Sequence, residues 1–180
     1  MGTGNEAKPL SRKDIRRMAK KFRKRLGIEN VIYVDVLRIL EIDMPNLFPN
    51  FDYEILTEEQ LGVHGLTTPD ENKIYIREDV YNGAARGEGR DRLTIMHEIF
   101  HFLFHRKQNI RLVQKGFARE DVNRPITYKD PEWQADAFAG EVLMDSDIIA
   151  DMNIFEISQK CGVSLAAART QKSKQKNQVK

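Results

Sequence analysis

The segment His97-Glu98-Ile99-Phe100-His101, near the middle of the chain, has residue types and a spacing that can hold a metal ion. On an α-helix, two residues four positions apart differ by about 40° of rotation and about 6 Å of rise. His97 and His101 therefore project from one face, close enough for both imidazoles to reach the same ion. Glu98 lies beside that ion, where it can hold a water molecule and accept its proton. The pattern predicts a metal-binding helix with Glu98 as the general base.

A simpler interpretation makes His97 and His101 two surface histidines on an ordinary amphipathic helix. Apolar residues recur at helical spacing around the motif, which favours a helix buried in the core. These residues are Leu93, Met96, Phe100, Leu103 and Phe104, widened by Ile95, Ile99 and Phe102. Because buried polar groups without partners are unfavourable, two histidines and a glutamate in such a helix favour the metal interpretation.

His105 continues the series of histidines but does not fit the same ion. It would lie about 12 Å along the helix axis from His97, which is too far for one ion to bridge. We expect His105 to be a helix-end residue that interacts favourably with the helix dipole.

A second helix supplies candidate acidic ligands. Asp130-Pro131-Glu132 has a capping Asp, a proline at the first helical position and an acid in the first turn, and the helix is expected to run to about Met144. Two histidines and a glutamate with an open position form one established catalytic zinc site, so Glu132 is the candidate third ligand. Asp136 lies on the same face and could orient a ligand histidine. The alternative is that Glu132 only complements the helix dipole.

Length and composition indicate one compact domain with a small appendage. The chain has 180 residues, of which 41% are hydrophobic and 31% charged. No apolar run approaches the 18 or so residues of a membrane span, and no signal peptide is visible. The single cysteine, Cys161, cannot form an intrachain disulfide. We therefore expect a cytoplasmic protein without membrane partners.

The small net charge of +2 conceals two basic ends and an acidic middle. Residues 1–30 carry ten Lys/Arg and three acids, and residues 169–180 carry five Lys/Arg and no acid. Basic ends could bind nucleic acid or an acidic partner. The alternative is that these charges only solvate helix faces, and no aromatic residues interleave with the basic ones near the N-terminus.

The chain before the motif predicts two helices and a small sheet. Residues 1–10 read as a disordered leader. A helix begins at a Ser11 cap and ends near Gly27, and a short helix capped by Asp35 is expected to stop at Pro45. Three strands are expected at 52–56, 62–67 and 73–77, with a turn at 68–72.

Two loops flank the motif helix, which is expected to start at about Arg90 or Asp91. Residues 83–89 contain three glycines and read as a flexible loop. Residues 106–130 form a connection long enough to suggest a substrate-binding loop or lid. His64 is expected to be a histidine in or beside a strand, with a catalytic role as the less favoured alternative.

The C-terminal part predicts helix, turn, helix. Residues 153–161 and 165–170 flank Gly162-Val163-Ser164, a spacing that resembles the helix-turn-helix of DNA-binding proteins, although packed helices of this kind are common structural material. The tail 171–180 is expected to be disordered. We predict a catalytic domain at 1–145 and a C-terminal helical segment at 146–180.

Together these stretches resemble the ImmA/IrrE family of metallopeptidases. The resemblance rests on R-L-T-I-M-H-E-I-F-H-F-L-F-H at 92–105 and E-W-Q-A-D-A-F-A-G-E-V-L-M at 132–144, with a looser likeness at 154–169. It implies an α+β fold with a zincin-like core, N-terminal helices, a small sheet of about three strands and C-terminal helix-turn-helix-like helices. It also implies metal ligands at His97, His101 and Glu132, Glu98 as catalytic base, and Asp136 beside a ligand.

The same resemblance implies a function. Family members are site-specific proteases that cut a partner transcriptional repressor and thereby release phage-like, mobile-element or stress-response genes. For this chain it implies a zinc-dependent endopeptidase, with Mn²⁺ or another divalent ion as alternatives, whose substrate is a helix-turn-helix repressor.

The chain departs from the family pattern at two places. Many members carry a second acid where this chain has Gln134, which leaves Glu132 as the strong ligand candidate. Many also end this helix in L-L-M-P, where this chain has Met144-Asp145.

Two other classes of function remain open. The basic ends and the C-terminal helix pair suit a DNA-binding regulator with a structural metal, but closed structural zinc sites usually use four Cys/His ligands, and Cys161 is the only cysteine. A toxin or scaffold that keeps the fold without turnover is the third possibility.

Overall fold

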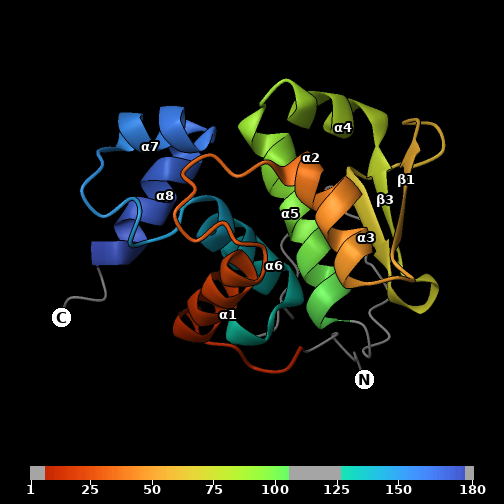
Figure 1. The fold of residues 1–180 in the computed structure, drawn as a ribbon, viewed down its shortest axis with the longest axis horizontal. Coiled ribbons are helices and arrows are strands. Elements are labelled where there is room, and N and C mark those ends of the chain that lie inside the picture. Colours follow the sequence, from red (N-terminus) through yellow and green to blue (C-terminus); the bar gives the residue numbers. More distant parts are fainter. Residues whose placement is uncertain (1–6, 106–126, 177–180) are drawn as a thin grey trace.

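The computed structural model describes residues 7–105 and 127–176, which form a mixed α+β fold around one long helix. This helix, α5 (Gly89–Phe104), carries the H-E-x-x-H motif and begins one residue before the predicted start. In Figure 1, α5 runs through the middle of the molecule, with the sheet on one side and α6 (Pro131–Leu143) and α1 (Arg12–Arg25) on the other. The motif helix is therefore covered on both sides, as its apolar composition predicts.

The three predicted strands form one sheet in the order β1-β3-β2. β1 (Asp52–Leu56) is parallel to β3 (Lys73–Arg77), and β2 (Gly65–Thr68) is antiparallel to β3. Among the described residues, β2 has no strand on its other side. The predicted turn between β2 and β3 is present as a short 3₁₀ helix (Pro69–Glu71), followed by Asn72 in the left-handed region with φ of 54°.

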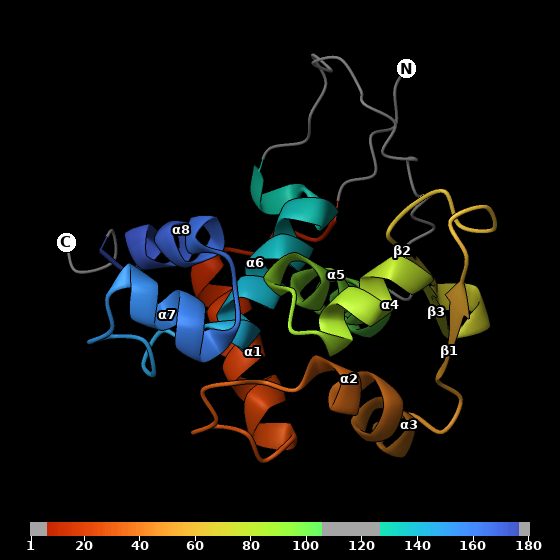
Figure 2. The same cartoon turned by 90° about the horizontal axis from the view of Figure 1, so that it is seen from above.

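The core is continuous from the sheet to α1. Ile74 and Ile76 of β3 are fully buried. On the other side of α5, Phe100 packs against Phe138 of α6, and Phe138 packs against Phe22 of α1, with ring centroids 5.0 and 5.6 Å apart. Figure 2 shows the resulting order of sheet, α5, α6 and α1 from above. The aromatic contacts fix how α5 and α6 lie against each other.

The N-terminal helix has the predicted cap. The Ser11 side chain accepts from the backbone N–H of Asp14, and the Asp14 carboxylate accepts from the N–H of Ser11. The predicted disordered leader is wrong for residues 7–10, because Ala7 and Leu10 donate backbone hydrogen bonds to Lys129 and Tyr128. Residues 1–6 lie outside the described part.

The second helix does not stop at Pro45, contrary to the prediction. Asp35 caps it as expected, but α2 (Val36–Arg38) continues through a π-helical turn (Ile39–Asp43) into α3 (Met44–Leu47). Pro45 lies in the first turn of α3, where a helix does not need its N–H. The wider π turn before it makes the continuation possible.

Residues 83–89 are not a flexible loop, which corrects a second prediction. α4 (Glu78–Ala85) extends through Gly83, and only a tight turn with Gly87 at φ of 84° separates it from α5. A Cβ on Gly83 would overlap the carboxylate of Asp91. Gly83 therefore lets two helices approach closely, and the sequence alone does not distinguish this use of glycine from flexibility.

The C-terminal helices occur where they were expected. α7 (Ile154–Cys161) is capped by Asn153, Gly162 adopts the left-handed conformation, and α8 (Leu165–Lys176) follows. The Arg92 guanidinium of α5 donates to the carbonyls of Cys161 and Gly162, which attaches this pair to the motif helix. DNA binding by this pair, and the domain division at residue 145, stay predictions.

The prediction of disorder from residue 171 is wrong up to Lys176, because α8 continues to that residue. Gln171 is buried; its amide nitrogen donates to the Met144 carbonyl, and its amide oxygen accepts from Arg12 at 2.6 Å. A polar composition alone suggested disorder, whereas these long-range contacts order the segment. Residues 177–180 lie outside the described part.

Within the two described ranges, no helix is both long enough and apolar enough to cross a bilayer.

Candidate metal centre

Three side chains from two helices converge on one point. His97 and His101 lie one turn apart on α5, and Glu132 lies in the first turn of α6, which the Asp130 cap holds in place. His97 Nε2 is 2.9 Å from His101 Nε2. His97 Nε2 lies 3.3 Å from Glu132 Oε2, and His101 Nε2 lies 3.3 Å from the other oxygen, Oε1. The structure thus brings together the three residues that the sequence suggested as ligands.

These separations fit a tetrahedral ion. Zinc bonds of about 2.0–2.1 Å in tetrahedral geometry place neighbouring ligand atoms about 3.3 Å apart. The two nitrogens lie 2.9 Å apart, and each faces a different oxygen of Glu132 at 3.3 Å. The set contains two imidazoles and a carboxylate, which zinc accepts, and one donor atom from each can be chosen so that all lie within 4.8 Å of one another. Three side chains that each give one atom leave one position of a tetrahedron open, as in catalytic rather than structural sites.

Asp136 holds His97 from the other side of the ring. Its Oδ1 lies 2.7 Å from His97 Nδ1. A carboxylate only accepts, so Nδ1 donates, and once the ring is neutral its lone pair is on Nε2, the atom that faces His101 and Glu132. The structure therefore places Asp136 where the sequence suggested, although its side chain is 69% exposed.

Within this group, a protonated His97 and an ionised Glu132 stabilise each other. Burial lowers the pKa of His97, but hydrogen bonds to Asp136 and Glu132 outweigh burial and raise that pKa to about 10. Burial raises the pKa of Glu132, but hydrogen bonds to His101 and His97 hold that pKa well below its usual range. A divalent ion would take the place of the proton that His97 holds without it.

Glu98 is held by the sheet. The residue is buried (6% exposed), and its Oε2 accepts from the Thr67 hydroxyl at 2.7 Å. A Cβ on Gly65 would lie 2.7 Å from Glu98 Cγ, so the glycine leaves room for this carboxylate. Gly65 and Thr67 are two residues apart in β2 and face α5 together.

The sequence prediction missed Thr67 and Gly65. Their one signal was a Gly-x-Thr alternation within a predicted strand, which does not reveal what the strand faces.

His105 is the C-cap residue of α5, so the predicted position at the helix end is confirmed, but the predicted interaction with the helix dipole is wrong. It is buried (3% exposed), with Nδ1 at 2.8 Å from His101 Nδ1 and Nε2 at 3.3 Å from Gln134 Oε1. Burial and the neighbouring His101 lower the pKa of His105 to about 4, so the ring is neutral and has no charge for the dipole to stabilise. The prediction that it does not share the ion with His97 agrees with its place behind His101.

Gln134 lies behind His105, away from the three donor atoms. Its Nε2 donates to the carbonyls of Lys8 and Tyr128 at 2.8 and 2.9 Å. An acid at this position would face His105 rather than join Glu132 beside the ligand nitrogens. The departure from the family pattern at Gln134 therefore leaves the three-donor group intact.

His64 lies apart from this group. It is exposed just before β2, and its backbone carbonyl accepts from the N–H of Arg77. This position agrees with the simpler interpretation of a histidine beside a strand. Most of the predicted substrate loop, residues 106–126, lies outside the described part.

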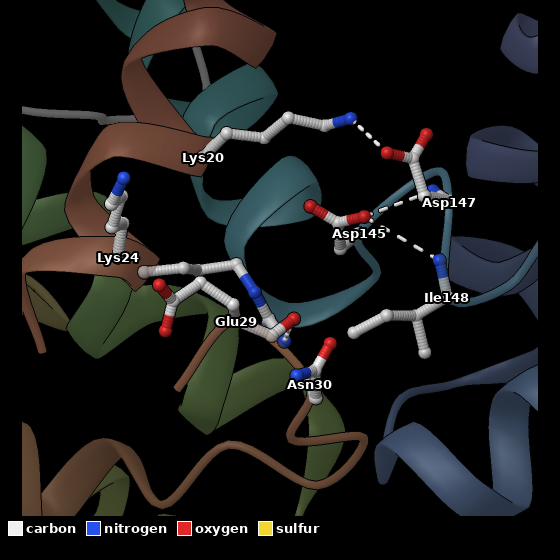
Figure 3. A pocket seen from close by; sticks show the side chains of 8 residues that line it. Lys20, Lys24, Glu29, Asn30, Asp145, Asp147 and Ile148 are labelled. Atoms are coloured by element: carbon white, nitrogen blue, oxygen red, sulfur yellow. Dashed lines mark hydrogen bonds and ion pairs between the residues drawn. The ribbon is translucent and has the colours of Figure 1, made fainter. Parts of the chain in front are cut away.

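A separate hollow of about 490 Å³ lies between α1 and the segment after α6. Figure 3 shows Lys20 paired with Asp147, and Asp145 accepting from the backbone of Asp147 and Ile148. Arg23 lines it and donates to the Val142 carbonyl. Its charged groups hold the chain in place, so the three-donor group is the better candidate active site.

Comparison with known families agrees with the geometry. Residues 58–171, from just before β2 into α8, match the Peptidase_M78 family model, described as an IrrE N-terminal-like domain. The match covers well over half of the chain. It includes the three candidate ligands His97, His101 and Glu132, together with Glu98. No curated protein matches the chain.

Proposed function

The chain belongs to the ImmA/IrrE family of metallopeptidases, and from that premise we propose that it is a zinc-dependent endopeptidase with a zincin-like core that cuts a partner transcriptional repressor. The observation that carries the proposal is the convergence of His97, His101 and Glu132, whose donor atoms lie within 4.8 Å of one another, next to the buried Glu98. Mn²⁺ or another divalent ion is the alternative, and the same donors would bind Mn²⁺ less tightly than zinc.

The three converging side chains would hold the ion, and the ion would activate both the substrate and the water. His97, His101 and Glu132 would hold it, and when bound it would polarise the scissile carbonyl and make water a nucleophile at neutral pH. Asp136 keeps the lone pair of His97 on Nε2, which is the form that can bind a metal.

Glu98 moves the proton in the proposed reaction. It accepts a proton from the attacking water as the oxygen bonds to the carbonyl carbon, and it then delivers that proton to the leaving nitrogen as the C–N bond breaks. Thr67 donates to Oε2 of Glu98 and leaves Oε1 to accept the proton. Holding the carboxylate in one orientation reduces the reorganisation needed during the step.

We propose that β2 also positions the substrate. Among residues 7–105 and 127–176, only β3 pairs with β2, and Gly65 and Thr67 of β2 lie against Glu98. An extended peptide added to the other side of β2 would form main-chain hydrogen bonds beside the general base.

The proposed substrate is a helix-turn-helix repressor. This part of the proposal rests on what the family resemblance implies, and the basic face of α1 offers a surface that could attract an acidic partner. We propose that the reaction takes place in the cytoplasm, where such a repressor would act on DNA.

The test is to incubate the zinc-loaded protein with the repressor-like protein encoded beside this gene, and separately with casein. We expect one or a few cuts in the repressor and little or no cleavage of casein. Cleavage should become slower as the salt concentration rises from 0.05 to 0.5 M, where the Debye length falls from roughly 14 to 4 Å.

The Glu98→Gln variant is the matched control and should cut nothing. Efficient, salt-independent digestion of casein would contradict the proposed specificity, and an uncut repressor would favour a scaffold without turnover.

A further inference from the structure

A line of polar contacts leads from the proposed metal centre to the backbone of the N-terminal segment. His101 Nδ1 lies 2.8 Å from His105 Nδ1, and His105 Nε2 lies 3.3 Å from Gln134 Oε1. The Gln134 amide nitrogen lies 2.8 Å from the Lys8 carbonyl and 2.9 Å from the Tyr128 carbonyl. His101, His105 and Gln134 are all buried, with 3%, 3% and 1% exposure, so these contacts are shielded from water.

The two carbonyls determine the direction of every hydrogen bond in this line. Carbonyl oxygens only accept, so the atom of Gln134 that faces both must be the NH₂ group, and its oxygen must face His105. That oxygen only accepts, so His105 carries its proton on Nε2 and has a bare Nδ1. The bare Nδ1 of His105 can only accept, so His101 donates from Nδ1. The lone pair of His101 is therefore on Nε2, the atom 3.3 Å from Glu132.

We propose that Gln134 and His105 are positioning residues, which hold His101 in its metal-binding tautomer by anchoring it to the Lys8 and Tyr128 carbonyls. The inference rests on the proposed metal centre and adds a support that the motif itself does not contain. Lys8 lies outside residues 58–171, the part that matches the family model. The segment before that part thus contributes to the geometry of the centre.

The segment that carries Lys8 is itself fixed. Ala7 donates to the Lys129 carbonyl at 2.8 Å, and Leu10 donates to the Tyr128 carbonyl at 2.9 Å. Tyr128 and Lys129 lie in the short 3₁₀ helix (Thr127–Lys129) just before α6. Gln134 therefore joins three parts of the chain, namely residues 7–10, this 3₁₀ helix and the end of α5.

The two ligand histidines are consequently held in different ways. His97 is oriented by a direct hydrogen bond to Asp136, an exposed carboxylate. His101 is instead oriented by the buried, neutral side chains of His105 and Gln134. A neutral line has no charge to screen, so its effect should not depend on salt, whereas that of the exposed Asp136 should weaken as salt rises.

The first measurement is the tautomer of each histidine in the zinc-loaded wild-type protein, from long-range ¹H–¹⁵N correlation spectra of the imidazole rings. We expect His101 to be protonated on Nδ1 and His105 on Nε2. A proton on Nδ1 of His105 would overturn the proposal, whatever the activity of the protein.

The second measurement is zinc affinity, by competition with a chromophoric chelator. Gln134→Met removes both the acceptor for His105 and the donors for the carbonyls, and should weaken binding by about 10- to 100-fold. Gln134→Glu retains an acceptor for His105, and at this buried position its protonated carboxyl can donate one bond to a carbonyl in place of two, so it should keep the His101 tautomer and lose less affinity. If Gln134→Met does not fold, Gln134→Glu still tests the tautomer.

Gln171→Met is the matched control, because Gln171 is also a buried glutamine whose amide donates to a backbone carbonyl, that of Met144. It should lower the melting temperature without changing zinc affinity. Wild-type affinity in Gln134→Met, with the His101 tautomer unchanged, would overturn the inference and leave the proposed function standing. A wild-type protein that binds no zinc would instead refute the proposed function.

Discussion

The hydroxyl of Thr67 lies 2.7 Å from Oε2 of Glu98 and 3.1 Å from the backbone carbonyl of the same residue. This pair joins the edge of the sheet to the motif helix at the residue proposed as general base. The sheet therefore has a direct part in the site, because it fixes the orientation of a buried carboxylate.

Replacing Thr67 by Val should lower activity without lowering metal content. Valine keeps the shape of the side chain but removes the hydroxyl, so Glu98 loses one hydrogen bond, worth about 1 kcal/mol, and its fixed orientation. We expect kcat/KM to fall about tenfold, which corresponds to about 1.4 kcal/mol. Thr68→Val is the control, because that hydroxyl lies near Glu71 and the Lys73 carbonyl instead. Equal loss in both variants would argue against a special role for Thr67.

Replacing Gly65 by Ala should displace Glu98. The new Cβ would lie 2.7 Å from Glu98 Cγ, which is closer than carbon atoms pack. The carboxylate or the strand must shift, and a shift of this size in a catalytic group can reduce the rate by about 100-fold. Gly62→Ala is the matched control, since nothing lies within 4 Å of its Cβ position. Steady-state kinetics at full zinc loading would distinguish the two, and unchanged kcat/KM in Gly65→Ala would contradict the proposed packing.

Replacing Asp136 by Ala should weaken metal binding. His97 would lose the acceptor on Nδ1 that keeps its lone pair on Nε2, and loss of such a partner typically reduces affinity by about 10- to 100-fold. Competition with a chelator gives the value directly, and repeating it at rising salt should shrink the effect. Asp147→Ala, another exposed acid, serves as the comparison. The same affinity in Asp136→Ala and the wild type would mean that Asp136 has no part in the centre.

The metal-free protein should lose stability as the pH rises. The pKa of His97 is raised from 6.5 to about 10 in the folded state, so its stabilising contribution is complete below pH 6.5 and disappears between 6.5 and 10. The pKa of Glu132 is lowered from 4.5, so its contribution is complete above pH 4.5 and is lost as the pH falls further.

Melting temperatures of chelator-treated and zinc-loaded protein between pH 5 and 10 test this expectation. With zinc bound, His97 binds the ion rather than a proton, so the alkaline loss should be much smaller. Parallel pH profiles for the two forms would show that His97 is not at the ion.

Much of the fold and the three candidate ligands could be predicted from the sequence because they depend on local patterns. The i, i+4 spacing places His97 and His101 on one face whatever the tertiary structure, and the Asp130 cap and Pro131 place Glu132 in the first turn of its helix. Both features are within one element, so a linear reading of the chain finds them.

The rest depends on contacts between distant segments. That Thr67 faces Glu98 follows from the position of β2 against α5, and the role of Gln134 follows from where residues 7–10 lie. The prediction of a flexible loop at Gly83 is wrong because the glycine is needed for space: Asp91, eight residues away, lies where a side chain would be. His105 was misread because burial, which neutralises it, is a property of the fold and not of the motif.

The division of labour between Glu98 and Glu132 is the central claim, and zinc affinity measured in Glu98→Gln and Glu132→Gln tests it most directly. Both variants replace a carboxylate by an amide of the same shape. Glu98→Gln should bind one zinc ion per chain as tightly as the wild type and cleave nothing, because it loses only the base. Glu132→Gln should lose affinity by at least about 100-fold, because it loses a charged ligand. Wild-type affinity in Glu132→Gln, or weak binding in Glu98→Gln alone, would contradict the assignment.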